Sequence, residues 1–82
     1  MALSIEERVI NLIAVQFDID PEEFDEASFL TDDLGADPPE LEVLSVLLAE
    51  EFDIDIPEEE FEVWETVADV ISYVTEKLRD EE

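Results

Sequence analysis

Apolar residues recur along the chain with the period of an α-helix, and the first such segment runs from Ser4 to about Gln16. Ser4 and Glu7 have the spacing of a capping box, in which each side chain bonds the other residue's backbone N–H group. The predicted inner face of this segment consists of Ile5, Val9, Leu12, Ile13 and Gln16. The pattern therefore predicts a first helix over residues 4–16.

A second helix is predicted from Pro38 to about Phe52, before the stretch FDIDIP interrupts it. Its buried stripe is expected to consist of Leu41, Leu44, Leu47 and Leu48. A short helical turn should follow, with Pro57 as its first residue and residues 58–60 in its first turn.

The last helix is predicted to begin after Thr66 as its cap and to end by Leu78 and Arg79, where basic side chains favour the carbonyl end. Its buried residues are expected to be Val67, Val70, Ile71 and Val74. The final residues, RDEE, are predicted to be frayed.

Between the first two helices the helical period is lost, and Pro21 and Gly35 punctuate a long loop over residues 17–37. Isolated apolar residues are expected to pin this loop to the core, namely Phe24, Phe29 and Leu34. QFDIDPEEF, which begins at Gln16, is echoed by EFDIDIPEEEF from Glu51. Because the preceding helices do not align, we interpret the echo as one helix-ending device used twice, not as a structural repeat.

Charge then narrows the possible partners. The chain has 27 acidic and 3 basic residues, a formal net charge of -24, which disfavours nucleic acids and anionic membranes and favours partners with basic patches. Hydrophobic residues make up 46% of the chain and are spread periodically among the acids, which indicates a folded domain and not a disordered acidic tail. Adaptation to a high-salt cytoplasm is an alternative cause of the acidity.

Residue types that the chain lacks exclude several kinds of catalysis and cross-linking. The chain has no cysteine and no histidine, which removes disulfides, thiol nucleophiles and imidazole catalysis. MALSIEERVI carries acids where a secretory signal has bases, and no apolar run approaches the roughly 20 residues of a membrane span. A soluble, cytoplasmic, monomeric protein is expected.

Carboxylates cluster in DDLGAD and FDIDIPEEE, which raises the question of a metal site. In the second stretch Ile56 and Pro57 stand where an EF-hand loop needs a tight glycine turn. Weak screening by divalent ions is expected, but no dedicated metal site. Short helices around an apolar core also suggest no obvious cleft for tuned catalytic carboxylates, so no enzymatic activity is expected.

Four phrases of the sequence resemble the acyl carrier protein family over nearly the full chain: IEERVINLIAVQF, ASFLTDDLGAD, EEFDIDIPEEE and TVADVISYV. The resemblance implies an all-α, four-helix bundle with three main helices, one short helix and a long loop between the first two. Because 82 residues can hold only one compact domain, residues 1–82 are expected to form a single acyl-carrier-like domain.

In that family an aspartate, a serine and a leucine begin the second helix, and the serine carries 4'-phosphopantetheine. Here the matching residues are Asp37, Pro38 and Pro39, so the resemblance implies a variant without the attachment hydroxyl and without the cofactor. From local physical chemistry, Asp37 is expected to cap the second helix and to stabilise it by about 1 kcal/mol relative to alanine. The two prolines fit the first turn of that helix. Ser45, flanked by Leu44 and Val46 inside the helix, is a poor alternative attachment site.

The resemblance further implies that the second helix presents carboxylates to basic patches on enzymes. The predicted partner-binding residues are Asp37, Glu40, Glu42 and Glu50. Val43 and Ala49 stand where the family usually has acids, and Glu42 where it usually has an apolar residue. The favoured hypothesis is a docking or scaffolding module; the alternatives are a noncovalent acyl-chain or lipid binder, or a carrier modified at another serine.

Overall fold

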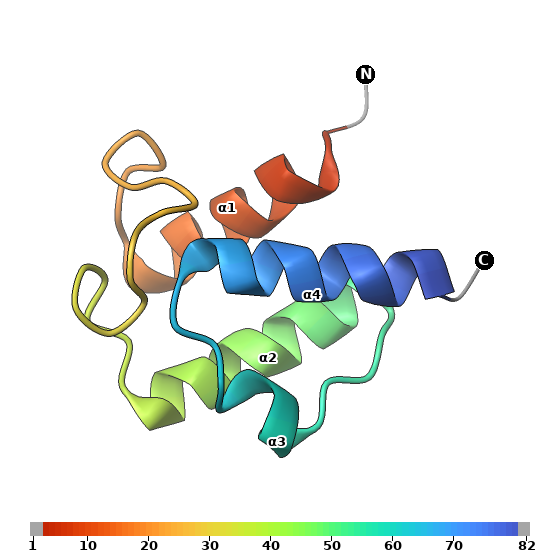
Figure 1. Cartoon of the computed structure of the whole chain (residues 1–82). Coiled ribbons are helices and arrows are strands. Elements are labelled where there is room, and N and C mark those ends of the chain that lie inside the picture. The colour runs from red at the N-terminus through yellow and green to blue at the C-terminus, as the bar shows by residue number, and fades with distance from the viewer. Residues whose placement is uncertain (1–2, 81–82) are drawn as a thin grey trace.

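The computed structural model describes residues 3–80, which form three long helices and one short helix (Figure 1). The helices are α1 (Ile5–Phe17), α2 (Pro38–Phe52), α3 (Glu58–Phe61) and α4 (Val67–Asp80). The all-α fold predicted from the sequence is confirmed, including the long loop between α1 and α2.

The predicted ends of the helices need two corrections. Pro57 is the N-cap of α3 and not its first helical residue; its extended backbone, with ψ at 158°, lies outside the helical region. Of the tail predicted to be frayed, Arg79 and Asp80 continue α4, whereas the last two residues lie outside the described part of the chain. The positive charges of Lys77 and Arg79 in this last turn interact favourably with the negative end of the helix dipole.

The predicted capping box at the start of α1 is confirmed. The Ser4 Oγ accepts a hydrogen bond of 3.1 Å from the Glu7 backbone N–H, and the Ser4 N–H donates to the Glu7 carboxylate at 3.3 Å. At the start of α4, Thr66 and Asp69 exchange the same kind of bonds, at 3.3 Å and 3.1 Å. Both helices therefore begin where local side-chain chemistry satisfies their free N–H groups.

The repeated FDID phrase ends both α1 and α2 in the same way. Asp18 and Asp53 each adopt a left-handed conformation, with φ at 55°. The following isoleucine N–H then bonds back to the helix, from Ile19 to the Ala14 carbonyl at 3.0 Å and from Ile54 to the Ala49 carbonyl at 3.1 Å. This pattern is the Schellman motif. The interpretation of the echo as one helix-ending device is confirmed.

The core receives side chains from the three long helices and from the loop. Residues with no exposed surface are Val9, Ile13, Leu30, Ala36, Leu44, Leu48, Val67, Val70 and Val74. As predicted, Phe24 is buried and Leu34 is half-buried, but Phe29 is 46% exposed and its neighbour Leu30 takes the inner position. Phe29 pairs with Thr66 in an isolated antiparallel bridge, and neighbouring side chains of extended backbone point to opposite sides.

The buried stripe of α2 also differs from its prediction at one residue. Leu41, Leu44, Ser45, Leu48 and Phe52 are buried, whereas Leu47 is 36% exposed. At about 100° per residue, Leu47 lies roughly 120° from the centre of this buried face. Leucine spacing alone did not reveal where the edge of the helix–helix contact falls.

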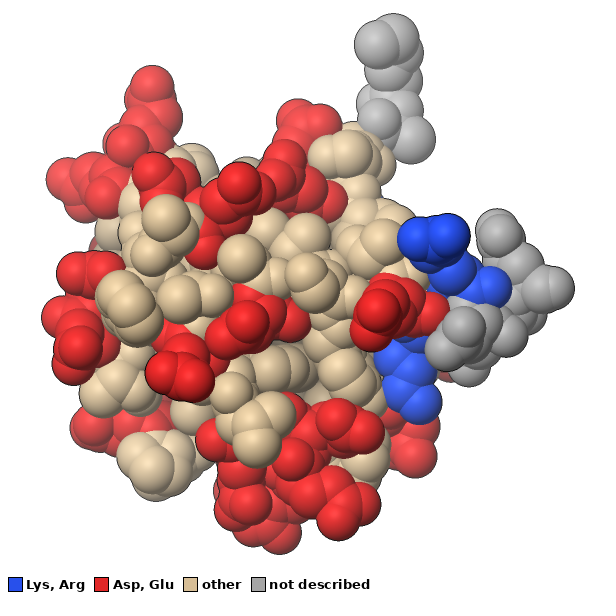
Figure 2. All heavy atoms as spheres, in the orientation of Figure 1, with Lys and Arg blue, Asp and Glu red and all other residues tan. Residues whose placement is uncertain are grey.

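Acidic side chains are spread over the whole face that the space-filling view shows, with other residues between them, and the visible basic side chains gather toward one edge (Figure 2). With a net charge of -24, the bundle carries a negative potential over most of its surface.

Candidate docking site

The first turn of α2 begins at Asp37, whose backbone is extended, with φ at -79° and ψ at 165°. The Asp37 carbonyl accepts bonds from the N–H groups of Glu40, at 2.9 Å, and Leu41, at 3.1 Å. Pro38 and Pro39 occupy the first two helical positions, where an N–H group has no intrahelical partner. Proline therefore starts this helix without disturbing its hydrogen bonds.

Asp37 is the N-cap residue of α2, as predicted, but the expectation that its side chain forms a capping hydrogen bond is wrong. Within residues 3–80, the Asp37 carboxylate accepts no capping hydrogen bond. The usual donors are the second and third N–H groups of the helix. Pro39 removes the first of these, and the N–H of Glu40 already bonds the Asp37 carbonyl. The expected stabilisation of about 1 kcal/mol from a capping bond therefore does not apply.

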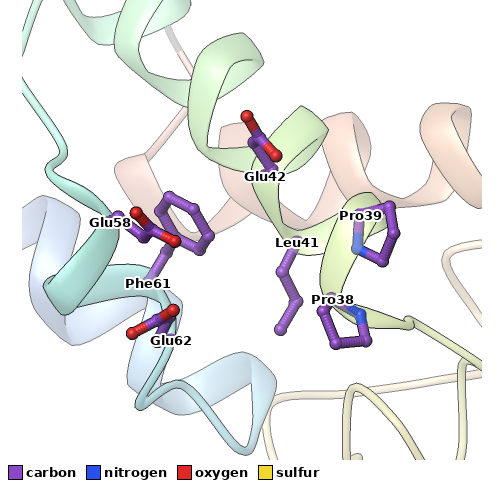
Figure 3. Close-up of a pocket in the computed structure, with 7 residues that line it drawn as sticks. All are labelled: Pro38, Pro39, Leu41, Glu42, Glu58, Phe61 and Glu62. Carbon is purple, nitrogen blue, oxygen red and sulfur yellow. The ribbon is translucent and has the colours of Figure 1, made fainter.

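An open pocket of about 440 Å³ lies between the start of α2 and α3, where the sequence had suggested no obvious cleft (Figure 3). Its lining residues are Pro38, Pro39, Leu41, Glu42, Glu58, Phe61 and Glu62. Leu41 and Phe61, each only 8% exposed, are its apolar anchors. α3 is too short to cover the first turns of α2, which leaves the hollow open.

The pocket combines an apolar surface with a negative rim. Glu42 from α2 and Glu58 and Glu62 from the α3 side are exposed carboxylates that border it (Figure 3). No base is found among the described residues that line it. The rim attracts ammonium and guanidinium groups, and it disfavours a ligand whose carboxylate would lie beside these glutamates.

The four predicted partner-binding residues do not form one patch. Glu42 borders the pocket, and Asp37 lies exposed at the helix start. Glu40 is half-buried on the side toward α1, where its carbonyl accepts a 2.9 Å bond from the Gln16 side chain. Glu50 is exposed about 12 Å further along the helix than Glu42, at 1.5 Å per residue. Their role in partner binding stays a prediction.

Sequence reasoning missed the contribution of α3. Glu58 and Glu62 are four residues apart, the spacing that places two side chains on the same side of a helical turn. The available signal was the run of glutamates after Pro57 together with Phe61, which needs a buried position. The sequence could not show that this turn folds back against the start of α2.

Hydroxyl groups near the site do not offer a free attachment point for a prosthetic group. The first turn of α2 contains proline, proline, glutamate and leucine. Ser45, two turns further on, is 4% exposed, and its Oγ donates a 2.6 Å bond to the Glu42 carbonyl. Thr31 in the preceding loop donates to the Ala36 carbonyl at 3.1 Å. The residues present at this helix start therefore do not fit a covalent phosphopantetheine ester.

Two further findings concern metals and membranes. In the described part of the chain, no three acidic side chains gather closely enough to hold a metal ion. Over the same residues, no helix has the length and apolar character needed to cross a membrane.

The described residues form a small helical domain with an open pocket beside the start of α2. Residues 7–74 match the family model described as the phosphopantetheine attachment site. The acyl carrier protein of Bdellovibrio bacteriovorus is 42% identical over 76 residues, which cover 92% of this chain and 96% of that protein. That of Clostridium acetobutylicum is 44% identical over 68 residues, 83% of this chain and 88% of the other.

A third relative, the acyl carrier protein of Caulobacter vibrioides, is 41% identical over 71 residues, 87% of this chain and 91% of that protein. The chain therefore belongs to the phosphopantetheine-attachment family, which confirms the resemblance to acyl carrier proteins. Acyl carrier proteins are not enzymes, so the expectation of a non-enzymatic protein is also confirmed.

Proposed function

We propose that this protein is a carrier-family docking module that works without a covalently attached phosphopantetheine arm. Its partners are enzymes of fatty-acid or polyketide-type metabolism that bind carriers through a basic patch. The observation that carries the proposal is Pro38 as the first residue of α2, because its side chain has no oxygen to which the arm could be esterified.

Charge supports the docking part of the proposal. The exposed carboxylates of Glu42, Glu58 and Glu62 surround an apolar pocket, and a partner can neutralise them with lysine or arginine while covering Leu41 and Phe61. The net charge of -24 accelerates encounter with a basic surface, most strongly at low ionic strength. The proposed protein is a cytoplasmic, single-domain monomer, as expected from its sequence.

Intact-mass measurement tests the missing arm. The protein is incubated with coenzyme A and a phosphopantetheinyl transferase, beside the variant Pro38→Ser with Pro39→Leu and the acyl carrier protein of Caulobacter vibrioides as a positive control. We expect the mass of the native chain to stay unchanged and the masses of the variant and the control to rise by one phosphopantetheine. A gain by the native chain contradicts the proposal, and peptide mapping then identifies the modified residue.

Charge reversal tests the docking surface. We expect Glu42→Lys and Glu58→Lys each to weaken binding to a carrier-binding ketosynthase, and the weakening to shrink at high salt. The predicted residues Glu40 and Glu50 are reversed in the same series. Glu22→Lys is the matched control, because Glu22 is an exposed acid of the long loop outside the pocket. Equal effects of Glu22→Lys and Glu42→Lys would mean that overall charge, not this surface, governs binding.

A second candidate function is noncovalent binding of an acyl chain, which the apolar anchors Leu41 and Phe61 favour. The glutamate rim favours a neutral head group over a free carboxylate. A bound ligand raises the melting temperature by mass action. We expect long-chain alcohols to raise it more than fatty acids of equal length, and an unchanged melting temperature with every chain length contradicts this function.

A further inference from the structure

The outward face of α2 is mostly apolar, in a protein whose surface is otherwise dominated by acids. Val43, Val46 and Leu47 are 50%, 51% and 36% exposed. At about 100° per residue, these three and Pro39 lie on the side of the helix opposite Leu41, Leu44 and Leu48. Glu50 is the single acid among them. We name Pro39, Val43, Val46 and Leu47 the outer stripe of α2.

A shallow groove adjoins this stripe where α2 meets α1. It has a volume of about 360 Å³ and is separate from the pocket at α3. Its apolar lining consists of Leu3, Leu12, Val15 and Leu47. Val15 of α1 is 82% exposed and Leu3, just before α1, is 52% exposed, so two further aliphatic side chains adjoin Leu47 of the outer stripe. Scattered single apolar residues need no explanation, but a contiguous apolar surface on a highly charged protein indicates a binding surface.

One end of the groove is held by the cation Arg8. Its Nη2 donates to the Glu51 carboxylate at 2.8 Å and to the Glu51 carbonyl at 3.2 Å, and its guanidinium stacks on the Phe52 ring at 4.4 Å. At the other end the Gln16 side chain donates to the Glu40 carbonyl at 2.9 Å. These contacts fix the two helices side by side, so the groove is formed before any partner arrives.

Charge around the groove determines the chemistry of the occupant. By helical position Glu42 flanks the outer stripe on one side, and Glu40 and Glu51 flank it on the other. Arg8, the one cation in the groove lining, is already engaged by Glu51. A partner therefore needs aliphatic side chains in its centre and lysine or arginine at its edges. A second copy of this chain would instead bring two surfaces of the same negative sign together.

The length of the groove limits the shape of the occupant. Arg8 and Gln16 are eight residues apart on α1, a distance of roughly 12 Å at 1.5 Å per residue. A partner helix covers this length in about two turns, at 5.4 Å per turn, and can present residues at spacings of three and four to the groove.

We propose that the groove between α1 and α2 docks an amphipathic helix of a partner protein, with an aliphatic face and flanking lysine or arginine residues. The residues that line this groove are not those that line the docking pocket at α3, and the interface does not depend on whether a prosthetic arm is attached.

The test uses the full chain and two synthetic helical peptides of equal positive charge. One peptide carries leucines at helical spacing between flanking lysines, and the other carries glutamine in place of each leucine. Binding is measured by fluorescence anisotropy at moderate salt. We expect the leucine peptide to bind at least about tenfold more tightly, or ~1.4 kcal/mol. Equal affinities overturn the proposal, because charge alone would then explain binding.

Substitutions in the protein test whether the leucine peptide binds in this groove. Val15→Asp should reduce the affinity for the leucine peptide by about tenfold or more. Because Val15 is 82% exposed, the substitution is compatible with folding. Leu47→Asp should do the same from the α2 side. Val63→Asp is the matched control, because Val63 is a 67% exposed valine outside the groove. Equal weakening by Val63→Asp and Val15→Asp overturns the assignment to this groove.

Two controls distinguish docking in this groove from docking at the α3 pocket and from self-association of the chain. Val15→Asp should leave ketosynthase docking through Glu42 and Glu58 unchanged when the leucine peptide is absent, so failure of either interface is visible by itself. Sedimentation of the native chain over a range of concentrations tests the other occupant. A dimer that Val15→Asp abolishes would overturn the proposal in favour of self-association.

Discussion

Among single residues, the carboxyl group of Glu6, in the first turn of α1, lies against that of Glu26 in the loop. A hydrogen bond with Glu26, followed by repulsion between the two charges, raises the pKa of Glu6 above its usual value. Because the pKa of Glu6 is higher in the folded than in the unfolded chain, its stabilising contribution is present below the unfolded pKa. It is lost as the pH rises through the folded pKa.

Replacing Glu6 with glutamine should therefore increase the free energy of unfolding at neutral pH. The amide can donate a hydrogen bond to Glu26 without adding a charge. At about pH 4, where Glu6 is largely protonated, the gain should shrink toward zero. Urea unfolding at both pH values measures the difference. Glu22→Gln removes one exposed loop charge for comparison, and the same pH-dependent gain in that variant would contradict the specific role of Glu26.

Arg8 links α1 to the end of α2 through Glu51 and Phe52. The ion pair is over a third exposed on both sides, so solvent screening reduces its contribution. With the stacked ring included, Arg8→Ala should lower the free energy of unfolding by about 1 kcal/mol. Arg8→Lys should recover only part of the loss, because an ammonium cannot form the planar stack and the fork of bonds.

Chemical denaturation of these two Arg8 variants provides the measurement, and Lys77→Ala is the control for loss of a positive charge. If Lys77→Ala destabilised the protein as much as Arg8→Ala, net charge and not the contact with Glu51 would be responsible.

Among the secondary-structure elements, the ends of α1 and α2 offer room to increase the stability of the fold. Each helix ends at an aspartate with a left-handed backbone conformation. Asp18 and Asp53 have positive φ, which is unfavourable for a residue with a Cβ atom, and a negative charge opposes the carbonyl end of the helix dipole. Asp18→Gly and Asp53→Gly should each stabilise the protein by about 0.5 kcal/mol, after the greater freedom of glycine in the unfolded chain is included.

Thermal unfolding of the glycine variants tests this prediction, with Asp53→Ala as the companion that removes the charge but keeps the Cβ atom. We expect Asp53→Ala to be less stable than Asp53→Gly. A rise in melting temperature that is equal in both variants would assign the whole effect to charge and none to backbone strain.

Charge repulsion is the dominant property of the whole molecule. At a net charge of -24, folding concentrates like charges, and salt reduces the repulsion as the screening length falls from about 10 Å at 0.1 M to about 3 Å at 1 M. The melting temperature should rise by several degrees over this range, since about 1 kcal/mol corresponds to roughly 4–8 °C in a small domain.

A scanning calorimetry series in sodium chloride measures this response, and calcium chloride at low concentration tests the expected weak divalent screening. A melting temperature that does not change with sodium chloride would show that repulsion is already balanced by local contacts such as the Arg8 pair. Saturable stabilisation by calcium that sodium chloride does not reduce would contradict the expectation of no dedicated metal site.

The helices were predictable because their signals are local. The Ser4 and Glu7 capping box, the repeated FDID phrase and the period of Val67, Val70 and Val74 act within a few residues, and the structure has each of them. The two prolines at the start of α2 were likewise readable as helical positions. These features depend on backbone hydrogen bonds whose partners are close in sequence.

Other features depend on contacts between distant residues, and only the tertiary structure decided them. The exposure of Leu47 follows from where α1 ends its contact with α2, and the inner place of Leu30 follows from its backbone bond to Glu65. The sequence by itself determined the helices, the charge and the lack of a hydroxyl at Pro38. Tertiary packing decided which side chains meet, and it alone brings Glu58, Phe61 and Glu62 to the start of α2, because side-chain periodicity fixes a residue's direction but not its neighbour.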